Sequence, residues 1–383
     1  MIMIKRTVFE SEHEMFRDSF RKFLLEEAVP YHEQWEKDGQ VSRELWKKAG
    51  NNGYLCPTVP EAYGGVEGDF RFNAIVDEEI ANLGLSGIGF GLHSDIAIPY
   101  IMAYGTEDQK QRYLPGCVNG DIITAIAMTE PGTGSDLQGV KTNAVLDASG
   151  EFYILNGSKT FITNGQMADL VIVVVKTNPE AGSKGTSLLL VEAATLGFEK
   201  GQNLHKIGMK AQDTSELFFQ DVKVPKDNLL GAEGLGFIYL MQELPQERLS
   251  VGLNAIASAE SILIQTIKYV KERKAFGREI SSFQNTQFKL AEMSATLTMA
   301  RVFVDKCLEL HLDKRLDVVT AAKLKLLSTD IQCDVIDECL QLHGGYGYMW
   351  EYPVARAYAD ARVQKIYAGT NEIMKLIIGR SLV

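Results

Sequence analysis

Hydrophobic positions change their spacing twice along the chain of 383 residues. Over residues 9–119 the apolar side chains recur with a helical period, seen for example at Phe16, Phe20, Phe23 and Leu24. Turn signals that contain glycine or proline stand at 63–65 and at 115–116. The spacing predicts an N-terminal helical domain, to which we assign residues 1–120.

Short branched or aromatic runs replace the helical period over residues 121–230. Branched and aromatic side chains favour the pleated surface of a sheet, so each run predicts a strand. The predicted strands are Ile122–Met128, Phe152–Leu155, Leu170–Val175, Ser187–Val191 and Glu216–Val224. Asn156-Gly157 and Asn164-Gly165 are typical of turns between strands. We therefore expect a central, barrel-like β domain at 121–233.

The helical period returns after Gly236 and continues to the end of the chain. One stripe of apolar side chains predicts the buried face of a long helix: Leu249, Leu253, Ile256, Leu263, Ile267 and Val270. Residues 234–383 are expected to form a C-terminal helical domain. The order of helices, strands and helices predicts the α+β fold class, and the sequence shows no internal repeat.

Composition excludes several classes of function. A net charge of −11 argues against nucleic acid or an anionic membrane as a general partner, since neither attracts an acidic surface. The five cysteines lack a Cys-x-x-Cys pair and the six histidines are dispersed, so we predict neither a disulfide framework nor a metal site. No apolar run approaches the roughly 20 residues of a membrane span, and we expect no integral membrane segment and no cleaved signal. The chain also lacks the glycine motifs of Rossmann nicotinamide enzymes and P-loop hydrolases.

The loop at 127–136 carries the most chemical information. It reads Ala-Met-Thr-Glu-Pro-Gly-Thr-Gly-Ser-Asp and follows a predicted strand. Thr129, Thr133 and Ser135 supply hydroxyl groups, while Gly132 and Gly134 let backbone N–H groups approach a planar, polar ligand. The pattern suggests a bound flavin; taken alone, it is equally typical of a tight surface turn.

Five motifs in order extend this interpretation over nearly the whole chain. They are Ala127–Ser135, Phe161–Asn164, Leu244–Leu249, Arg273–Gly277, and Gln341–Gly345 together with Tyr367–Glu372. In these motifs the sequence resembles the acyl-CoA dehydrogenase family, and within it most closely the long-chain enzymes. The resemblance implies N-terminal helices, a central β domain, a C-terminal four-helix bundle, FAD, a homotetramer, and oxidation of an acyl-CoA to its trans-2-enoyl product. It also implies electron transfer flavoprotein as the acceptor, and a cytoplasmic or mitochondrial matrix location.

One departure from the commonest family pattern bears on the mechanism. Many relatives carry the catalytic glutamate at the position that is Ala368 here, and a methyl group cannot remove a proton. In the long-chain and isovaleryl branches the base lies on a C-terminal helix, where Glu247 matches. We predict Glu247 as the general base. The alternative is a structural carboxylate at a helix start, which Pro245 would mark two residues earlier.

The same resemblance assigns the residues that hold cofactor and substrate. Those predicted to contact FAD are Ile126, Met128, Thr129, Gly134, Ser135, Phe161, Thr163, Arg273, Phe276, Gln284, Gln341, His343, Gly344, Gly345, Thr370, Asn371 and Glu372. The segment around Arg273 is implied to reach the FAD of a neighbouring subunit; a solvated basic helix end is the alternative. Residues predicted to contact substrate are Ser135, Arg248, Ala368 and Gly369.

Two other functions fit the same motifs. One is a flavin oxidase or monooxygenase on this fold; the other is a catalytically silent, acyl-CoA-binding flavoprotein, which Ala368 would suggest if Glu247 were only structural. The sequence leaves acyl chain length undetermined, because one methylene changes discrimination by only about 1–3 kcal/mol. A medium or long straight chain is our first expectation, and a branched chain such as isovaleryl is the alternative.

Overall fold

The computed structural model describes residues 4–383 and begins with a layer of helices. These are α1 (Ser11–Glu27), α2 (His32–Asp38), α3 (Arg43–Asn51), α4 (Phe70–Asn82), α5 (Ile98–Tyr104) and α6 (Glu107–Val118). A π-helix, Leu92–Ala97, runs into α5 without a break. The predicted turn at 115–116 is wrong, because Pro115 and Gly116 lie inside α6 and the chain turns at Gly120. Gly116 lies against Ile122, where a Cβ would approach that side chain to 2.6 Å.

The central domain is a mixed, mostly antiparallel sheet. Its strands are β1 (Thr124–Ala127), β2 (Asn143–Leu146), β3 (Phe152–Thr163), β4 (Leu170–Lys176), β5 (Thr186–Glu192), β6 (Phe198–Asn203), β7 (Thr214–Pro225) and β8 (Leu229–Leu230). They lie in the order β6-β7-β3-β2-β4-β5-β8, and β1 pairs with β4 in parallel. The five predicted strands are all present, whereas the pattern missed β2, β6 and β8.

The two Asn-Gly pairs differ in role. The turn at Asn164 is confirmed, since the residue adopts a left-handed φ of 61° directly after β3. The turn at Asn156 is wrong: β3 continues through it with an irregularity against β7. Gly157 is needed there because a Cβ would lie 2.5 Å from the Thr142 hydroxyl oxygen. The glycine therefore allows close approach inside a strand.

Strands β4 and β5 are buried on both faces and join two cores. Successive side chains of a strand point to opposite sides. Leu170, Ile172 and Val174 accordingly pack into the core shared with the N-terminal helices, while Val171 and Val173 pack inside the sheet. The β domain is thus fixed to the N-terminal helices by apolar contacts along its central strands.

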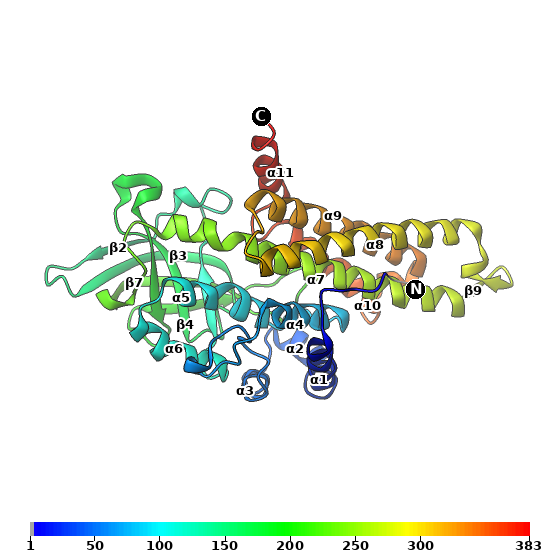
Figure 1. Ribbon diagram of the computed structural model, residues 1–383, viewed down its shortest axis with the longest axis horizontal. Coiled ribbons are helices and arrows are strands. Elements are labelled where there is room, and N and C mark those ends of the chain that lie inside the picture. Colours follow the sequence, from blue (N-terminus) through cyan, green and yellow to red (C-terminus); the bar gives the residue numbers. More distant parts are fainter. Residues whose placement is uncertain (1–3) are drawn as a thin grey trace.

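Long helices make up the C-terminal part, which Figure 1 shows extending away from the sheet. They are α7 (Gly236–Glu272), α8 (Gln284–Leu312) and α9 (Val318–His343), with α10 (Pro353–Ala361) and α11 (Asn371–Arg380) packed against α9. A hairpin of β9 (Lys274–Ala275) and β10 (Arg278–Glu279) joins α7 to α8. The predicted apolar stripe of α7 is confirmed: Ile267 is partly buried and the other five residues are buried.

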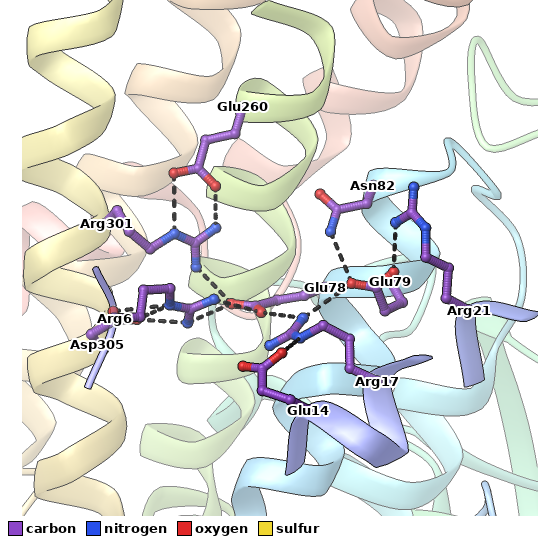
Figure 2. Close-up of polar contacts among 10 residues, drawn as sticks. All are labelled: Arg6, Glu14, Arg17, Arg21, Glu78, Glu79, Asn82, Glu260, Arg301 and Asp305. Atoms are coloured by element: carbon purple, nitrogen blue, oxygen red, sulfur yellow. Dashed lines mark hydrogen bonds and ion pairs between the residues drawn. The ribbon is translucent and has the colours of Figure 1, made fainter. Parts of the chain in front are cut away.

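An ion-pair network ties α4 to its neighbours (Figure 2). The buried Glu78 carboxylate on α4 accepts from Arg6, Arg17 and Arg301 at 2.6–3.1 Å. Arg301 also binds Glu260 of α7 in a bidentate pair. These charges lower the pKa of Glu78 to about 2 although burial opposes its ionisation. Helix α4 is therefore held in one position between α1, α7 and α8.

Candidate active site

Glu247 lies inside α7, and the prediction that Pro245 marks a helix start is wrong. The helix begins nine residues earlier, at Gly236, and continues through the proline. Proline lacks an N–H, so one backbone hydrogen bond is missing from the turn that precedes Glu247. The position therefore receives no stabilisation from a helix N-terminus, and this explanation for an acidic residue at 247 no longer applies.

The Glu247 side chain is buried, with 5% of its surface exposed. Tyr100 of α5 donates a hydrogen bond of 2.9 Å to its Oε1. Among the described residues, no donor binds Oε2. One carboxylate oxygen is thus fixed and the other is free to accept a proton.

Burial also sets the basicity of Glu247. Loss of solvent raises the pKa of its carboxyl to about 7, although the Tyr100 hydrogen bond and the Arg248 charge lower it; the Glu243 charge raises it further. Burial raises the pKa of Tyr100 well above its ordinary value, so this hydroxyl keeps its proton and acts as the donor. A carboxyl with a pKa near 7 is suited to general base catalysis at neutral pH.

Arg248 is also buried, and within residues 4–383 its Nε and Nη1 atoms have no hydrogen-bond partner. A Cβ added to Gly369 would lie 3.9 Å from Arg248 Nη2, which places this side chain against the 368–370 segment. An unpaired buried guanidinium is costly unless it meets a polar or anionic group. Its unpaired N–H groups can meet a polar substrate there.

The segment before α11 adopts an unusual backbone. Ala368 and Gly369 have left-handed φ values of 51° and 84° in succession. The ammonium of Lys325, on α9, donates to the Gly369 carbonyl at 2.8 Å and to Asn371 Oδ1 at 2.9 Å. Thr370 caps α11 through the Ile373 N–H. This held turn leaves the Ala368 N–H without a partner in the described part of the chain, as an oxyanion donor requires.

The hydroxyl-rich loop follows β1 and rests on a buried ion pair. Lys159 of β3 is fully buried and donates to Glu130 Oε1 at 2.9 Å and to the Met128 carbonyl at 3.0 Å. Glu130 also accepts from the backbone of Lys141 and Thr142. Sequence analysis missed this pair, because Lys159 lies beyond the predicted strand Phe152–Leu155 and beyond the turn predicted at Asn156-Gly157. The Lys159–Glu130 pair therefore anchors the loop to β3.

The predicted flavin residues of the β domain lie on β1, in the loop that follows it, and at the end of β3. Ile126 is buried, Met128, Thr129 and Thr163 are half-buried, and Gly134 and Ser135 are exposed. The Thr160 N–H donates to the Thr129 carbonyl at 2.9 Å and joins the loop to β3. The next residue, Phe161, has a left-handed φ of 59° and is 67% exposed. An exposed aromatic ring held on a strained backbone fits a planar ring system such as the isoalloxazine of FAD.

A third group of predicted residues lies far from Glu247 in the same chain. Arg273 follows α7, and 26 residues of helix separate it from Glu247, about 39 Å at 1.5 Å per residue. Phe276 lies in the β9–β10 hairpin with 96% of its surface exposed, and Gln284 begins α8. The chain alone does not bring these residues to the proposed base. That separation is what a contribution to a neighbouring subunit requires.

The glycine pair after α9 lies at this distant end as well. His343 stacks on Tyr269 of α7 at 4.2 Å and bonds the Cys339 carbonyl through Nδ1. Gln341, Gly344 and Gly345 are exposed beside it, and Gly344 ends the helix with a φ of 59°. By contrast, Thr370, Asn371 and Glu372 border a hollow of 540 Å³ between α9 and α11. The residues at this distant end therefore lie apart from Glu247 within one chain.

Two features of the described residues concern other classes of site. No three or more His, Cys, Asp or Glu side chains of residues 4–383 gather where a metal ion would fit. Across the same range, every helix is too short or too polar to cross a bilayer.

Comparisons with known proteins match all three parts of the chain. The acyl-CoA dehydrogenase N-terminal, middle and C-terminal domain models match residues 10–121, 125–222 and 234–383. Long-chain specific acyl-CoA dehydrogenase of Rattus norvegicus mitochondria is 56% identical over 99% of this chain and 88% of its own length. An acyl-CoA dehydrogenase structure from Geobacillus kaustophilus superposes with a TM-score of 0.97 at 52% identity, covering 99% of this chain and all of that one. A Bacillus anthracis acyl-CoA dehydrogenase in complex with FAD has a TM-score of 0.92 at 32% identity over 99% and 69% of the two chains.

Proposed function

Because the chain belongs to the acyl-CoA dehydrogenase family, a group of flavin oxidoreductases, we propose that Glu247 is the base of an FAD-dependent α,β-dehydrogenation of acyl-CoA. One observation supports this assignment above the others. Glu247 is a buried carboxylate whose Oε2 has no donor, in a chain that carries Ala368 where many relatives carry the base.

Glu247, Tyr100 and the Ala368 N–H each have a distinct role in the proposed reaction. When bound against the loop 128–135 and Phe161, FAD would supply the acceptor for a hydride from the substrate β-carbon. Glu247 removes the α-proton at Oε2, while Tyr100 holds Oε1 and keeps the carboxylate orientation fixed. The partnerless Ala368 N–H is placed to donate to the thioester oxygen, which makes the α-proton more acidic. Burial of this region excludes water and keeps the base near neutral pKa.

For the cofactor, we propose that the loop 128–135 and Phe161 hold the flavin ring of the same chain. Arg273, Phe276, Gln284 and the Gln341–Gly345 segment then act on the FAD of a second subunit, because they lie about 39 Å along α7 from Glu247. This arrangement requires an oligomer, and we propose the homotetramer that the family resemblance implies. Arg248 and Gly369 are proposed to contact the acyl-CoA.

The proposed substrate is a medium or long straight-chain acyl-CoA, with electron transfer flavoprotein as acceptor. Identity of 56% to a mitochondrial long-chain specific enzyme supports the chain length. The mitochondrial origin of that relative supports a mitochondrial location if the source is eukaryotic, for which we propose the matrix; for any other source we propose the cytoplasm.

Anaerobic titration of the FAD-bound protein with acyl-CoAs tests the proposal. Butyryl-, octanoyl-, palmitoyl- and isovaleryl-CoA are added in turn, and loss of the flavin absorbance at about 450 nm is followed. Bleaching is expected with octanoyl- or palmitoyl-CoA and is expected to be lost in Glu247→Gln. Glu243→Gln, a matched change one turn earlier on α7, should still bleach. Normal bleaching in Glu247→Gln, or none in the unmodified protein with any of the four, would refute it.

A further inference from the structure

A second buried carboxylate, Asp95, lies at a junction of three helices close to the proposed base. It belongs to the π-helix Leu92–Ala97 and is 3% exposed. Gln246 and Ser250 of α7 stand one residue before and three residues after Glu247. Gln246 Nε2 donates to the Asp95 carbonyl at 2.6 Å, and Ser250 Oγ donates to Asp95 Oδ2 at 3.2 Å. Asp95 thus accepts hydrogen bonds from α7 residues on both sides of Glu247 in the sequence.

Helix α4 completes this junction. Asn73 Nδ2 donates to Asp95 Oδ1 at 2.5 Å, and the buried carboxyl of Asp77 interacts with that of Asp95, its Oδ2 having no other partner among residues 4–383. Burial, followed by the charge of Asp95, raises the pKa of Asp77 well above its ordinary range. Asp77 is therefore the protonated member and donates to Asp95. A Cβ at Gly91 would lie 2.7 Å from Asp77 Oδ1, so the junction has no room for a larger residue there.

The same π-helix leads directly to the residue that binds the base. Asp95 precedes Tyr100 by five residues, with continuous helix between them. Tyr100 donates to Glu247, which lies between Gln246 and Ser250. The contacts therefore form a closed circuit from Asp95 through α5 to Glu247 and back through α7. Helix α4, which the Glu78 network holds in place (Figure 2), contacts this circuit through the hydrogen bond from Asn73 to Asp95.

We propose that Asp95 is a positioning residue for Glu247, and that its hydrogen bonds fix the register of α5 against α7 at which the Tyr100 hydroxyl meets the base. This inference rests on the proposed function, since it concerns the orientation of the same carboxylate. Asp77 serves as the neutral partner of Asp95: burial raises the pKa of Asp95 to about 6, and its hydrogen bonds with Asn73, Asp77 and Ser250 oppose that rise.

Several other titratable or charged groups lie near the carboxyls of Glu247 and Asp77, and none of them is altered by the substitutions proposed below. Arg248 and Glu243 act on Glu247 from α7, and Glu78 and Tyr367 lie near Asp77 from α4 and from the segment before Ala368. The Tyr100 hydrogen bond lowers the pKa of Glu247. If Asp95 no longer holds the register, that bond weakens and the pKa of the base rises. On the acid side of the rate–pH profile the rate falls as the base is protonated. This acid limb must then move to higher pH.

The test compares two Asp→Asn variants of the FAD-bound enzyme by anaerobic stopped-flow reduction with octanoyl-CoA from pH 5.5 to 9.5. Asp95→Asn places an amide where Asn73 or Ser250 donates, and reduction at pH 7 should slow about ten-fold or more, with the acid limb moved upward. Asp77→Asn conserves the donor, and its limb and rate should stay within about two-fold of the unmodified enzyme. Asp18→Asn, an exposed change on α1, controls for the substitution itself.

Outcomes separate this inference from the proposed function. An Asp95→Asn enzyme with a lower Tm but an unmoved acid limb would show a purely structural role and overturn the proposal. Equal damage from Asp77→Asn would overturn the assignment of the proton. If Asp95→Asn does not fold, Ser250→Ala decides, with an expected slowing of about three-fold and a limb moved the same way; an unmoved limb refutes the inference. Absence of bleaching in the unmodified enzyme, or normal bleaching in Glu247→Gln, refutes the proposed function instead.

Discussion

Replacing Tyr100 by phenylalanine tests the tuning of the proposed base most directly. The change removes one hydroxyl, whose hydrogen bond of 2.9 Å to Glu247 Oε1 is buried at both ends. The aromatic ring stays, so the packing of α5 is kept. Without the donor the ionised form of Glu247 loses its direct hydrogen bond, while the protonated form loses much less. The pKa of Glu247 must rise from about 7.

The size of the effect follows from the charge on the acceptor. A hydrogen bond to a charged group contributes about 1.5–3 kcal/mol, which corresponds to a rise of about one to two pH units in the acid limb. At pH 7 the ionised fraction of Glu247 then falls from about one half to between about one tenth and one hundredth, so reduction slows by about 5- to 50-fold. Above the new limb the rate should recover, because the base itself is intact.

The assay is anaerobic stopped-flow bleaching of the flavin at low octanoyl-CoA concentration across pH. The apparent second-order rate constant under these conditions reports the pKa of the base in the free enzyme. Tyr104→Phe is the matched control, because Tyr104 lies one turn further along α5 and binds Glu243 and Gln242 instead. The acid limb of Tyr104→Phe should stay at the same pH or move slightly lower. Loss of the Tyr104 hydrogen bond favours the protonated form of Glu243, which then repels the Glu247 carboxylate less. A Tyr100→Phe limb that is unmoved or lowered would refute the reasoning.

Other substitutions probe the base, the loop support and the flavin face. The pKa of Glu247 is raised from 4.5 to about 7 in the folded protein, so its contribution to stability falls as pH rises between those values. Glu247→Gln should therefore raise Tm at pH 8 and not at pH 5; a lower Tm at pH 8 would contradict this. Lys159→Met leaves the Glu130 carboxylate buried without its cation and should cost about 3–5 kcal/mol of stability, with faster loss of FAD on dilution. Unchanged Tm and FAD retention would show that the pair does not support the loop. Phe161→Gly relieves a left-handed backbone worth about 1–2 kcal/mol, so the FAD-free protein should keep or gain Tm while FAD retention falls. Retention equal to that of the unmodified protein would remove Phe161 from the flavin face.

Local patterns predicted the order of the elements because each depends on a few neighbouring side chains. The buried stripe of α7 and the five main strands follow from spacing alone. The same local reasoning failed at 115–116 and 156–157, where proline or glycine lies inside an element. In each case packing decided the matter: Gly116 packs against Ile122, six residues later, and Thr142 leaves no space for a side chain at 157. Local turn preference is weaker than such packing.

The sequence by itself determined the family motifs, the loss of a base at Ala368 and the candidate at Glu247. Only the tertiary structure decided that Glu247 lies within a helix, is buried, and receives a proton donor from Tyr100, 147 residues away. It likewise brought Asp77 to Asp95 and separated Arg273 from Glu247. Basicity depends on solvent exclusion and on partners at hydrogen-bond distance, and both arise from packing between distant segments. Motif spacing therefore identifies which residues are present, while the fold determines what each carboxylate can do.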